Sequence, residues 1–193
     1  MKKICLFSMQ TLMVLSLFFA VSCEVTAVID DGNEVPDGKF KIGQDYQGGV
    51  VAYVDATGEH GLIAAPHDLS IGMRWHNGEH LVTEATGTTI GTGKNNTAMI
   101  IQMQGNGAYA AKLCADLVID EYDDWFLPSK DELNELYKNR AKIGGFSYTG
   151  IYWSSSEKDN ANAWYQSFYY GYDVYNTYYG KQQTYRVRAV RTF

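Results

Sequence analysis

Cysteine is scarce in this sequence, with three among 193 residues. Cys5 and Cys23 lie in, and directly after, an apolar N-terminal segment that is described below as a leader, so Cys114 is alone in the remainder of the chain. A lone cysteine cannot form an internal disulfide. We therefore expect packing to stabilise the fold, and a chain of this length can bury a sizeable core.

Positive charge is also in short supply. Lys and Arg number 16 against 22 Asp and Glu, the net charge is −6, and the basic residues form no stripe along the chain. Nucleic-acid binding depends on Lys and Arg that neutralise phosphate groups, so nucleic acid is not an expected partner. The hydrophobic fraction of 46% and the charged fraction of 20% are typical of one soluble globular domain.

Motifs for cofactor binding are incomplete. Gly91 to Asn95 has the composition of a phosphate-binding loop, but Thr88 stands where that motif has its first glycine, and Asn95 stands where it has Ser or Thr. His76 and His80 are four residues apart without the H-E-x-x-H order. We therefore expect neither a nucleotide site nor a metal site there, and we expect both histidines in an exposed loop.

Two groups of acidic and amide residues are candidates for catalysis or cation binding. Asp123 and Asp124 are neighbours in sequence, and a polar turn before Trp125 accounts for them. A second group offers oxygen ligands suited to Ca²⁺, although such residues are equally common in loops, and both interpretations stay open for Glu157, Asp159, Asn160 and Asn162. Since no Ser-His-Asp order and no activated cysteine can be argued, we expect a protein that is not an enzyme and uses no cofactor.

The N-terminus has the organisation of a secretory leader. A pair of lysines precedes an apolar run that includes Leu12–Ala20 and is too short to argue for a retained membrane span. The sequence A-V-S directly before Cys23 resembles the lipobox of bacterial lipoproteins. This resemblance implies a signal peptide over residues 1–22 and lipidation of Cys23, and a plain secretory signal is the alternative.

The chain changes character after the leader. Residues 23–38 are acidic and contain Gly and Pro, which predicts a flexible tether, and a globular domain is expected over residues 39–193. Acyl chains on Cys23 would attach this domain to the bacterial outer membrane or cell surface, since each buried methylene contributes about 0.8 kcal/mol to membrane binding.

The first half of the domain contains a predicted hairpin and two predicted helices. Val50–Val54 and Leu62–Ala65 flank a Gly-rich turn, which predicts a β-hairpin. A first helix is expected over Thr97–Met103 with Asn96 as its N-cap. A second helix has an apolar stripe at positions i, i+3, i+4 and i+7, formed by Ala110, Leu113, Cys114 and Leu117.

The third predicted helix has the clearest start, because S-K-D-E from Ser129 to Glu132 is a capping box. Tyr185 to Val190 alternates Val and Ala with Arg186 and Arg188, which predicts a strand with one solvent-facing side. The chain is therefore predicted to be α+β, with central helices and a small antiparallel sheet that joins N-terminal and C-terminal strands.

Tyrosine is concentrated in one segment. Residues 148–185 contain ten of the fifteen tyrosines together with many Asn, Asp, Ser and Gly residues, a composition typical of binding loops because Tyr supplies a large contact area with few side-chain torsions. Ordinary packing is the alternative, and we assign Tyr165 and Tyr185 to it. The candidate ligand-binding residues are Asp159, Asn160, Asn162, Tyr169, Tyr170, Tyr172, Asp173, Tyr175, Asn176, Tyr178 and Tyr179.

Several segments together resemble one bacterial family. They are Y-Q-G-G from Tyr46, H-G-L-I-A-A-P from His60, I-G-T-G-K from Ile90, Y-D-D-W-F-L-P-S-K-D-E-L from Tyr122, Y-W-S-S-S-E from Tyr152 and R-V-R-A-V-R from Arg186. They resemble the domain at the C-terminus of a bacterial collagen-like adhesin, the Lcl C-terminal family, over essentially all of residues 39–193.

The resemblance implies a C-type-lectin-like fold related to that of formylglycine-generating enzymes. Members of the family are secreted or surface proteins that bind ligands, including sulfated polysaccharides in the adhesin. Enzymatic activity is not implied, because the chemistry of those enzymes requires active-site cysteines and only Cys114 is present in the domain.

A narrower resemblance is to the variable proteins of diversity-generating retroelements, which carry a hypervariable segment at the C-terminus of the same fold. Mutagenesis of Asn codons in that segment yields Tyr, Asn, Asp, Ser and Gly, and Tyr169–Tyr179 has this composition. The resemblance implies a variable-type segment over about residues 148–185. It also implies that four residues are scaffold: Trp153, Trp164, Val187 and Val190.

We therefore expect a lipid-anchored, surface-displayed protein whose Tyr/Asn/Asp-rich C-terminal surface binds a ligand. The expected partner is a protein or polysaccharide on another cell, a phage or a host surface. Two alternatives remain open: a carbohydrate-binding adhesin domain with fixed specificity, and a structural component of a surface appendage.

Overall fold

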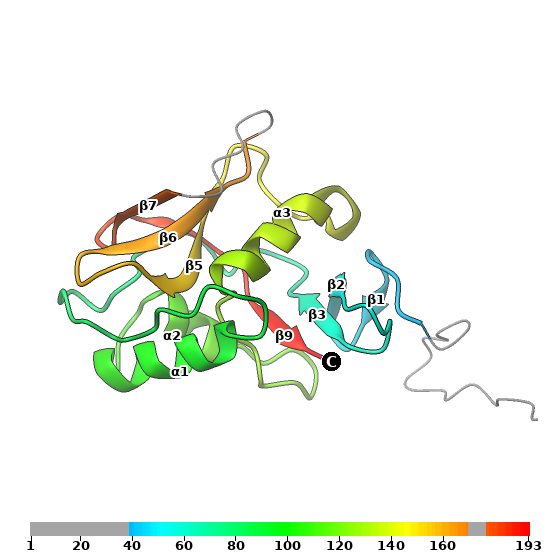
Figure 1. Cartoon of the computed structure of the whole chain (residues 1–193), viewed down its shortest axis with the longest axis horizontal. Coiled ribbons are helices and arrows are strands. Elements are labelled where there is room, and N and C mark those ends of the chain that lie inside the picture. Colours follow the sequence, from blue (N-terminus) through cyan, green and yellow to red (C-terminus); the bar gives the residue numbers. More distant parts are fainter. Residues whose placement is uncertain (1–38, 170–176) are drawn as a thin grey trace, which may run out of the picture.

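The structure is a computed structural model that describes residues 39–169 and 177–193. Within these residues there are three helices and nine strands, and the strands form two sheets (Figure 1). This confirms the predicted α+β class. In the view of Figure 1, α1 and α2 lie on one side of strands β5 and β6, and α3 lies next to β5 on the other.

The first sheet joins the two ends of the domain. Its order is β1-β2-β3-β9, and all neighbouring strands are antiparallel. The pairing of β2 with β3 confirms the predicted hairpin, and the pairing of β3 with β9 confirms that N-terminal and C-terminal strands share a sheet. The strands are β1 (Asp45–Tyr46), β2 (Gly49–Val54), β3 (Gly61–Ala64) and β9 (Val190–Thr192).

The second sheet has the order β4-β8-β5-β6-β7, in which only the β5–β8 pair is parallel among the described strands. Central strand β5 is covered on both faces, because Tyr152 packs in one apolar cluster with Phe126 and the next residue, Trp153, packs in another with Trp75. The strands are β4 (Ser70–Met73), β5 (Ile151–Glu157), β6 (Asn162–Ser167), β7 (Thr177–Gly180) and β8 (Tyr185–Val187).

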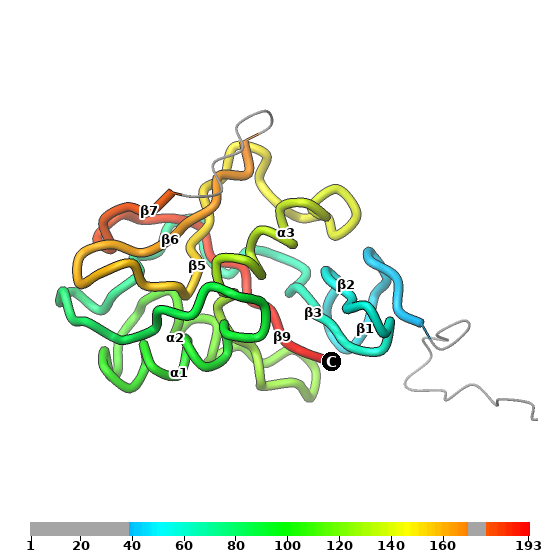
Figure 2. Tube along the Cα trace, in the orientation of Figure 1, coloured from blue at the N-terminus to red at the C-terminus, as the bar shows by residue number. Residues whose placement is uncertain are grey.

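The C-terminal segment crosses from one sheet to the other (Figure 2). Strand β8 ends before Arg188 and β9 begins after Ala189, so the prediction of one strand with a solvent-facing side is wrong. Arg188 is 1% exposed, and its guanidinium donates to the Asp68 carboxylate and to the Ala65 carbonyl, each at 2.8 Å. These acceptors satisfy the charge, which allows an arginine to occupy the buried crossover.

Helix α1 spans Gly93–Gln104 and therefore begins earlier than predicted. Asn96 was predicted to be the N-cap, but it lies in the first turn of the helix. There it is buried, and its side-chain amide donates to the Gly87 carbonyl at 2.6 Å. The prediction was wrong because the loop before the helix folds back against its first turn, a tertiary contact that the local sequence does not show.

Helix α3 (Lys130–Ile143) begins where predicted, and helix α2 (Ala110–Ala115) begins at Ala110 but ends before Leu117, the last residue of its predicted apolar stripe. Cys114 of α2 is buried in the core. The capping box of α3 is confirmed, since the Ser129 hydroxyl accepts from the Glu132 amide at 3.3 Å and the Glu132 carboxylate accepts from the Ser129 amide at 2.7 Å. None of the helices in the described part of the chain has the length and apolar character needed to cross a bilayer.

Candidate functional site

The candidate ligand-binding residues centre on β6 and β7, which pair antiparallel at one edge of the second sheet (Figure 1). Six of them are in the described residues: Asp159, Asn160, Asn162, Tyr169, Tyr178 and Tyr179. Five others, and the predicted lipidation site, lie outside the described residues: Tyr170, Tyr172, Asp173, Tyr175, Asn176 and Cys23.

Tyr178 and Tyr179 lie on opposite faces of the β6–β7 pair, because successive side chains of a strand alternate. In the register, Tyr178 is opposite Trp164 and Tyr179 is opposite Ala163. The two tyrosines are 43% and 54% exposed. The predicted set therefore does not share one patch, and each face of the hairpin presents its own aromatic surface.

The face that carries Tyr178 presents a cluster of rings and ammonium groups. The Trp164 and Tyr178 rings meet edge to face with their centroids 5.3 Å apart. Lys130 Nζ lies 4.6 Å from the Trp164 centroid, and Lys158 Nζ lies 5.6 Å from the Trp164 centroid and 5.4 Å from the Tyr178 centroid. At such distances a ring face attracts a cation. These four residues are named the Trp164 cluster below; half-buried Trp164 was predicted only as scaffold.

The opposite face is mostly packed. Tyr185 lies 4.4 Å from Trp153 and 5.2 Å from Tyr165, measured between ring centroids. Burial raises the pKa of Tyr185 to about 12 and also raises the pKa of Tyr165. The assignment of both tyrosines to packing is confirmed, and Tyr179 remains the exposed tyrosine on this face.

Buried residues flank the exposed tyrosines on both sides in sequence. Phe168 precedes Tyr169, which is 50% exposed, and Lys181 follows β7; both flanking side chains are fully buried. The Phe168 ring lies 4.4 Å from Tyr152 and 4.8 Å from Phe146, measured between centroids. The segment with the candidate tyrosines is thus attached to the core at each end.

Lys181 is held by three oxygens and a ring. Its Nζ donates to the Glu157 carboxylate at 2.5 Å, to the Asn160 carbonyl at 3.1 Å and to the Leu81 carbonyl at 3.2 Å, and it lies 4.5 Å from the Trp75 centroid. Burial lowers the pKa of Lys181, while the Glu157 carboxylate opposes that shift. No sequence pattern identified this lysine, because K-Q-Q after β7 is an ordinary polar turn in composition.

The two carboxylates considered as calcium ligands, those of Glu157 and Asp159, accept hydrogen bonds from protein donors. The Glu157 carboxylate accepts from the Thr83 amide at 2.9 Å and from the Glu84 amide at 3.0 Å. Asp159 Oδ1 accepts from the amide and the side chain of Asn162, each at 2.9 Å, which closes the β5–β6 turn. Within residues 39–169 and 177–193, no three or more His, Cys, Asp and Glu side chains gather where a metal ion could bind.

The glycine-rich segment before α1 is filled by a carboxylate rather than open to a phosphate. Glu132 Oε1 accepts from the Gly91 amide at 2.7 Å, and a Cβ on Gly93 would collide with the same carboxylate. Burial raises the pKa of Glu132, opposed by the hydrogen bonds from Ser129, Gly91 and Gly93. One carboxylate therefore accepts from amides at the start of both α1 and α3.

His76 is buried, so the expectation of an exposed histidine is wrong for this residue, while His80 is exposed. His76 Nδ1 accepts from the Gly78 amide at 2.7 Å, and the two imidazole rings meet edge to face at 4.8 Å. Burial lowers the pKa of His76, and the charges of His80, Lys181 and Arg74 add to this shift. The neutral ring is thus part of the packed loop that precedes α1.

Asp124 and Cys114 have structural surroundings. Arg191 donates to the Asp124 carboxylate at 2.6 Å, whereas neighbouring Asp123 is exposed, so the two aspartates do not act on one point. Cys114 is fully buried, and burial raises the pKa of its thiol, which disfavours the reactive thiolate.

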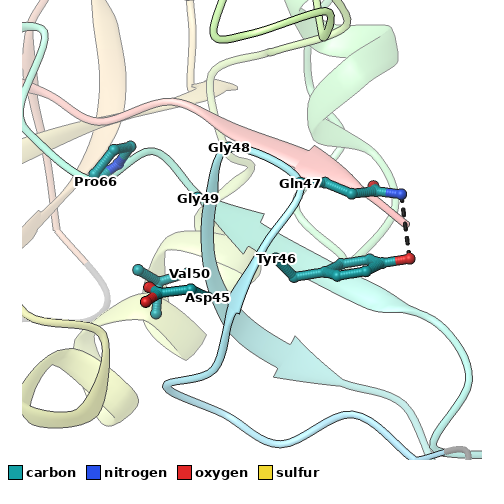
Figure 3. Close-up of a pocket in the computed structure, with 7 residues that line it drawn as sticks. All are labelled: Asp45, Tyr46, Gln47, Gly48, Gly49, Val50 and Pro66. Carbon is teal, nitrogen blue, oxygen red and sulfur yellow. Dashed lines mark hydrogen bonds between the residues drawn. The ribbon is translucent and has the colours of Figure 1, made fainter. Parts of the chain in front are cut away.

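A pocket of about 250 Å³ lies at the turn between β1 and β2 (Figure 3). At this turn Gln47, with φ of 46°, donates from its side-chain amide to the Tyr46 hydroxyl at 3.2 Å. The pocket shares no residue with the Trp164 cluster, and its lining is Asp45, Tyr46, Gln47, Gly48, Gly49, Val50 and Pro66.

The chain matches the model of a known family. The model of the Lcl C-terminal domain matches residues 65–191, a range that contains all three helices and the whole second sheet. No curated protein matches the chain in sequence. The family is one of surface or adhesin-type domains. Because the match covers most of the sequence, including every described candidate residue, the chain belongs to the Lcl C-terminal domain family.

Proposed function

We propose that this protein is a non-catalytic, surface-displayed ligand-binding protein that recognises protein or glycan targets through the tyrosines at and between β6 and β7. One observation carries the proposal: Tyr169, Tyr178 and Tyr179 are between 43% and 54% exposed on one hairpin. Large tyrosine rings commonly contribute most of the binding free energy of an interface. Their exposure close together on one hairpin supports a recognition surface.

The attachment of this hairpin supports diversification as the finer proposal. Phe168 and Lys181 are buried core residues on either side of the exposed tyrosines, so substitutions between them leave the core contacts of both unchanged. We propose the C-type-lectin-like fold and a retroelement-diversified segment on this basis together with the composition of Tyr169–Tyr179. The presence of a reverse-transcriptase gene and a near-repeat of the 3′ end in the genome would test the second part.

The engagement of buried ionisable groups supports a non-catalytic role. Glu157 is paired with Lys181, Glu132 accepts amides at two helix starts, and Cys114 is buried among apolar residues. A general acid or base, or a nucleophile, needs access to a substrate atom. None of these three groups has it.

Lipidation of Cys23 is the proposed means of display, and it rests on the sequence pattern before that residue. Intact-mass measurement of membrane-extracted protein tests it. A mass that includes acyl chains on a chain beginning at Cys23 is expected, and an unlipidated mass would contradict the anchor.

The binding surface is tested by alanine substitution at Tyr169, Tyr178 and Tyr179, separately and together. Each substitution is expected to cost about 2 kcal/mol or more in binding, which is roughly thirtyfold in Kd. Val118→Ala is the control, because Val118 is 62% exposed and lies after α2, outside residues 148–185. Thermal unfolding of each variant verifies that the fold is retained.

The same variants are assayed against ligands captured in a protein pulldown and on a glycan array. Alanine substitutions at Tyr170, Tyr172 and Tyr175 extend the series into the segment outside the described residues. Ligands that bind all of these variants as they bind the wild-type protein would contradict the proposed surface.

A further inference from the structure

The outer edge of β7 offers backbone groups to a partner. β7 is the last strand of the second sheet in the described residues. The Lys181 amide donates to the Ala161 carbonyl at 2.8 Å, and this bond fixes which residues of β7 direct their backbone N–H and C=O groups toward β6. In an antiparallel pair every second residue faces the neighbouring strand. Thr177 and Tyr179 therefore face β6, and the N–H and C=O of Tyr178 face the open edge.

Within the described residues, this edge lacks the usual protection against strand pairing. Edge strands are commonly blocked by a charged residue or Pro within the strand, or by a bulge. β7 has the sequence T-Y-Y-G, with no charge and no Pro, and its register with β6 is continuous over all four pairs. The rings of Tyr178 and Tyr179, on opposite faces, flank the exposed backbone.

The charges beside the edge determine what can pair with it. Lys130 and Lys158 lie over the rings of the Trp164 cluster, on the face of Tyr178. Of the two acidic residues that adjoin Lys158 in sequence, Glu157 is paired with buried Lys181, and Asp159 accepts hydrogen bonds within its own turn. Two copies paired at β7 about a two-fold axis would bring their Lys158 side chains together, and like charges across a strand pair are destabilising. An acidic strand brings opposite charges instead.

The lysine positions also bear on glycans. Sugar recognition by an aromatic residue uses an open ring face, and the ammonium of Lys130 lies 4.6 Å from the Trp164 centroid. The ring surface that a sugar would cover is therefore shared with a cation. An exposed backbone edge, in contrast, is complementary to another polypeptide backbone.

We infer that β7 is a docking strand, and that the partner is an extended, acidic segment of another protein that pairs with its outer edge. The partner backbone bonds to the N–H and C=O of Tyr178, and its carboxylates face Lys130 and Lys158. This inference rests on the proposed function, because it assigns the partner class to the same hairpin.

The partner class is tested by panning a phage-displayed library of random peptides against the full chain. Peptides that bind the wild-type protein are then counter-selected against the Lys130→Glu/Lys158→Glu double variant. The expected peptides are rich in Asp and Glu at alternate positions and lose binding to the double variant. Recovery of peptides without acidic residues would overturn the inference and leave the proposed surface intact. The same conclusion would follow if no peptide were recovered while a heparin fragment bound to the protein.

The backbone contact is tested by comparing Tyr178→Pro with Tyr178→Thr. Both variants lose the ring, but only the proline variant loses the outward N–H, and Pro is tolerated where the N–H of an edge strand faces solvent. The proline variant is expected to bind the selected peptide about tenfold more weakly than the threonine variant, the loss typical of one hydrogen bond. Equal binding by the two would refute strand pairing.

A second measurement avoids any change in the protein. The selected peptide is synthesised with N-methyl groups on alternate amides, in both phases, and titrated against the wild-type chain. One phase is expected to weaken binding about tenfold or more and the other to leave it unchanged. If neither phase weakens binding while Tyr169→Ala and Tyr179→Ala do, the tyrosine surface stands and the docking strand is rejected.

Discussion

Replacement of Lys181 by Met examines how strongly the buried ion pair holds the hairpin. Met has a similar length without the charge, so the change leaves the Glu157 carboxylate with the Thr83 and Glu84 amides as its donors. Removing one partner of a buried pair costs about 3–5 kcal/mol. The two remaining amide donors set our expectation at the lower end, about 3 kcal/mol, which is a large share of the roughly 5–15 kcal/mol that stabilises a domain.

Urea denaturation followed by tryptophan fluorescence measures this cost, and Trp75 reports on the site because its ring lies 4.5 Å from the lysine ammonium. Lys158→Met is the matched control, since Lys158 is exposed, and it is expected to cost less than about 1 kcal/mol. A double-mutant cycle with Glu157→Gln is expected to give a coupling free energy of about 1–3 kcal/mol. Equal costs for the two lysine substitutions would refute the argument that the pair holds β7.

Three further predictions concern the buried polar groups. Burial lowers the pKa of His76 below 6.5, so the unfolded chain binds the proton more tightly than the folded chain does. The free energy of unfolding is therefore expected to fall as the pH falls below about 6.5. In urea titrations between about pH 7.5 and pH 5.5, His76→Gln should reduce that pH dependence. Gly93→Ala should lower the free energy of unfolding by about 1–3 kcal/mol, because the collision with Glu132 outweighs the better helix propensity of Ala, and an unchanged melting temperature would contradict the geometry. Arg188→Met should cost about 3 kcal/mol in the same urea assay, because the Asp68 carboxylate keeps only Arg186 and Tyr152 as donors, and the cost should be smaller in an Asp68→Asn background.

Local patterns predicted the elements whose causes are local. The hairpin of β2 and β3 follows from a Gly-rich turn between two apolar runs, and the start of α3 follows from the capping box of Ser129 and Glu132. The α+β class follows from the sum of such elements. These parts of the fold depend on residues that are close together in sequence.

The errors arose where a distant partner decides the outcome. Arg188 was predicted to face solvent because arginine usually does, but Asp68 lies far away in sequence and accepts its charge in the interior. Asn96 and His76 were misplaced for a similar reason, since folded loops bury both. Lys181 was missed because its four partners come from two segments that are distant from it in sequence, residues 75–81 and 157–160.

The candidate site was predicted in composition but not in geometry. The enrichment in Tyr, Asn and Asp pointed to the hairpin, and three of its tyrosines are exposed. The contribution of Lys130, from α3, could not be seen, because only the folded structure brings it beside Trp164. Composition also could not show that Tyr178 and Tyr179 occupy opposite faces, since that depends on a strand assignment, which composition does not provide.

The crossover at Arg188 and Ala189 has a consequence for how the domain opens. Because β8 and β9 are consecutive on the chain yet belong to different sheets, loosening either strand strains the pairing of the other. Amide protons in the centres of both sheets should therefore exchange with solvent in one common opening event instead of two separate ones. A domain built this way opens as one cooperative unit, so surface residues can be replaced freely only while that unit stays closed.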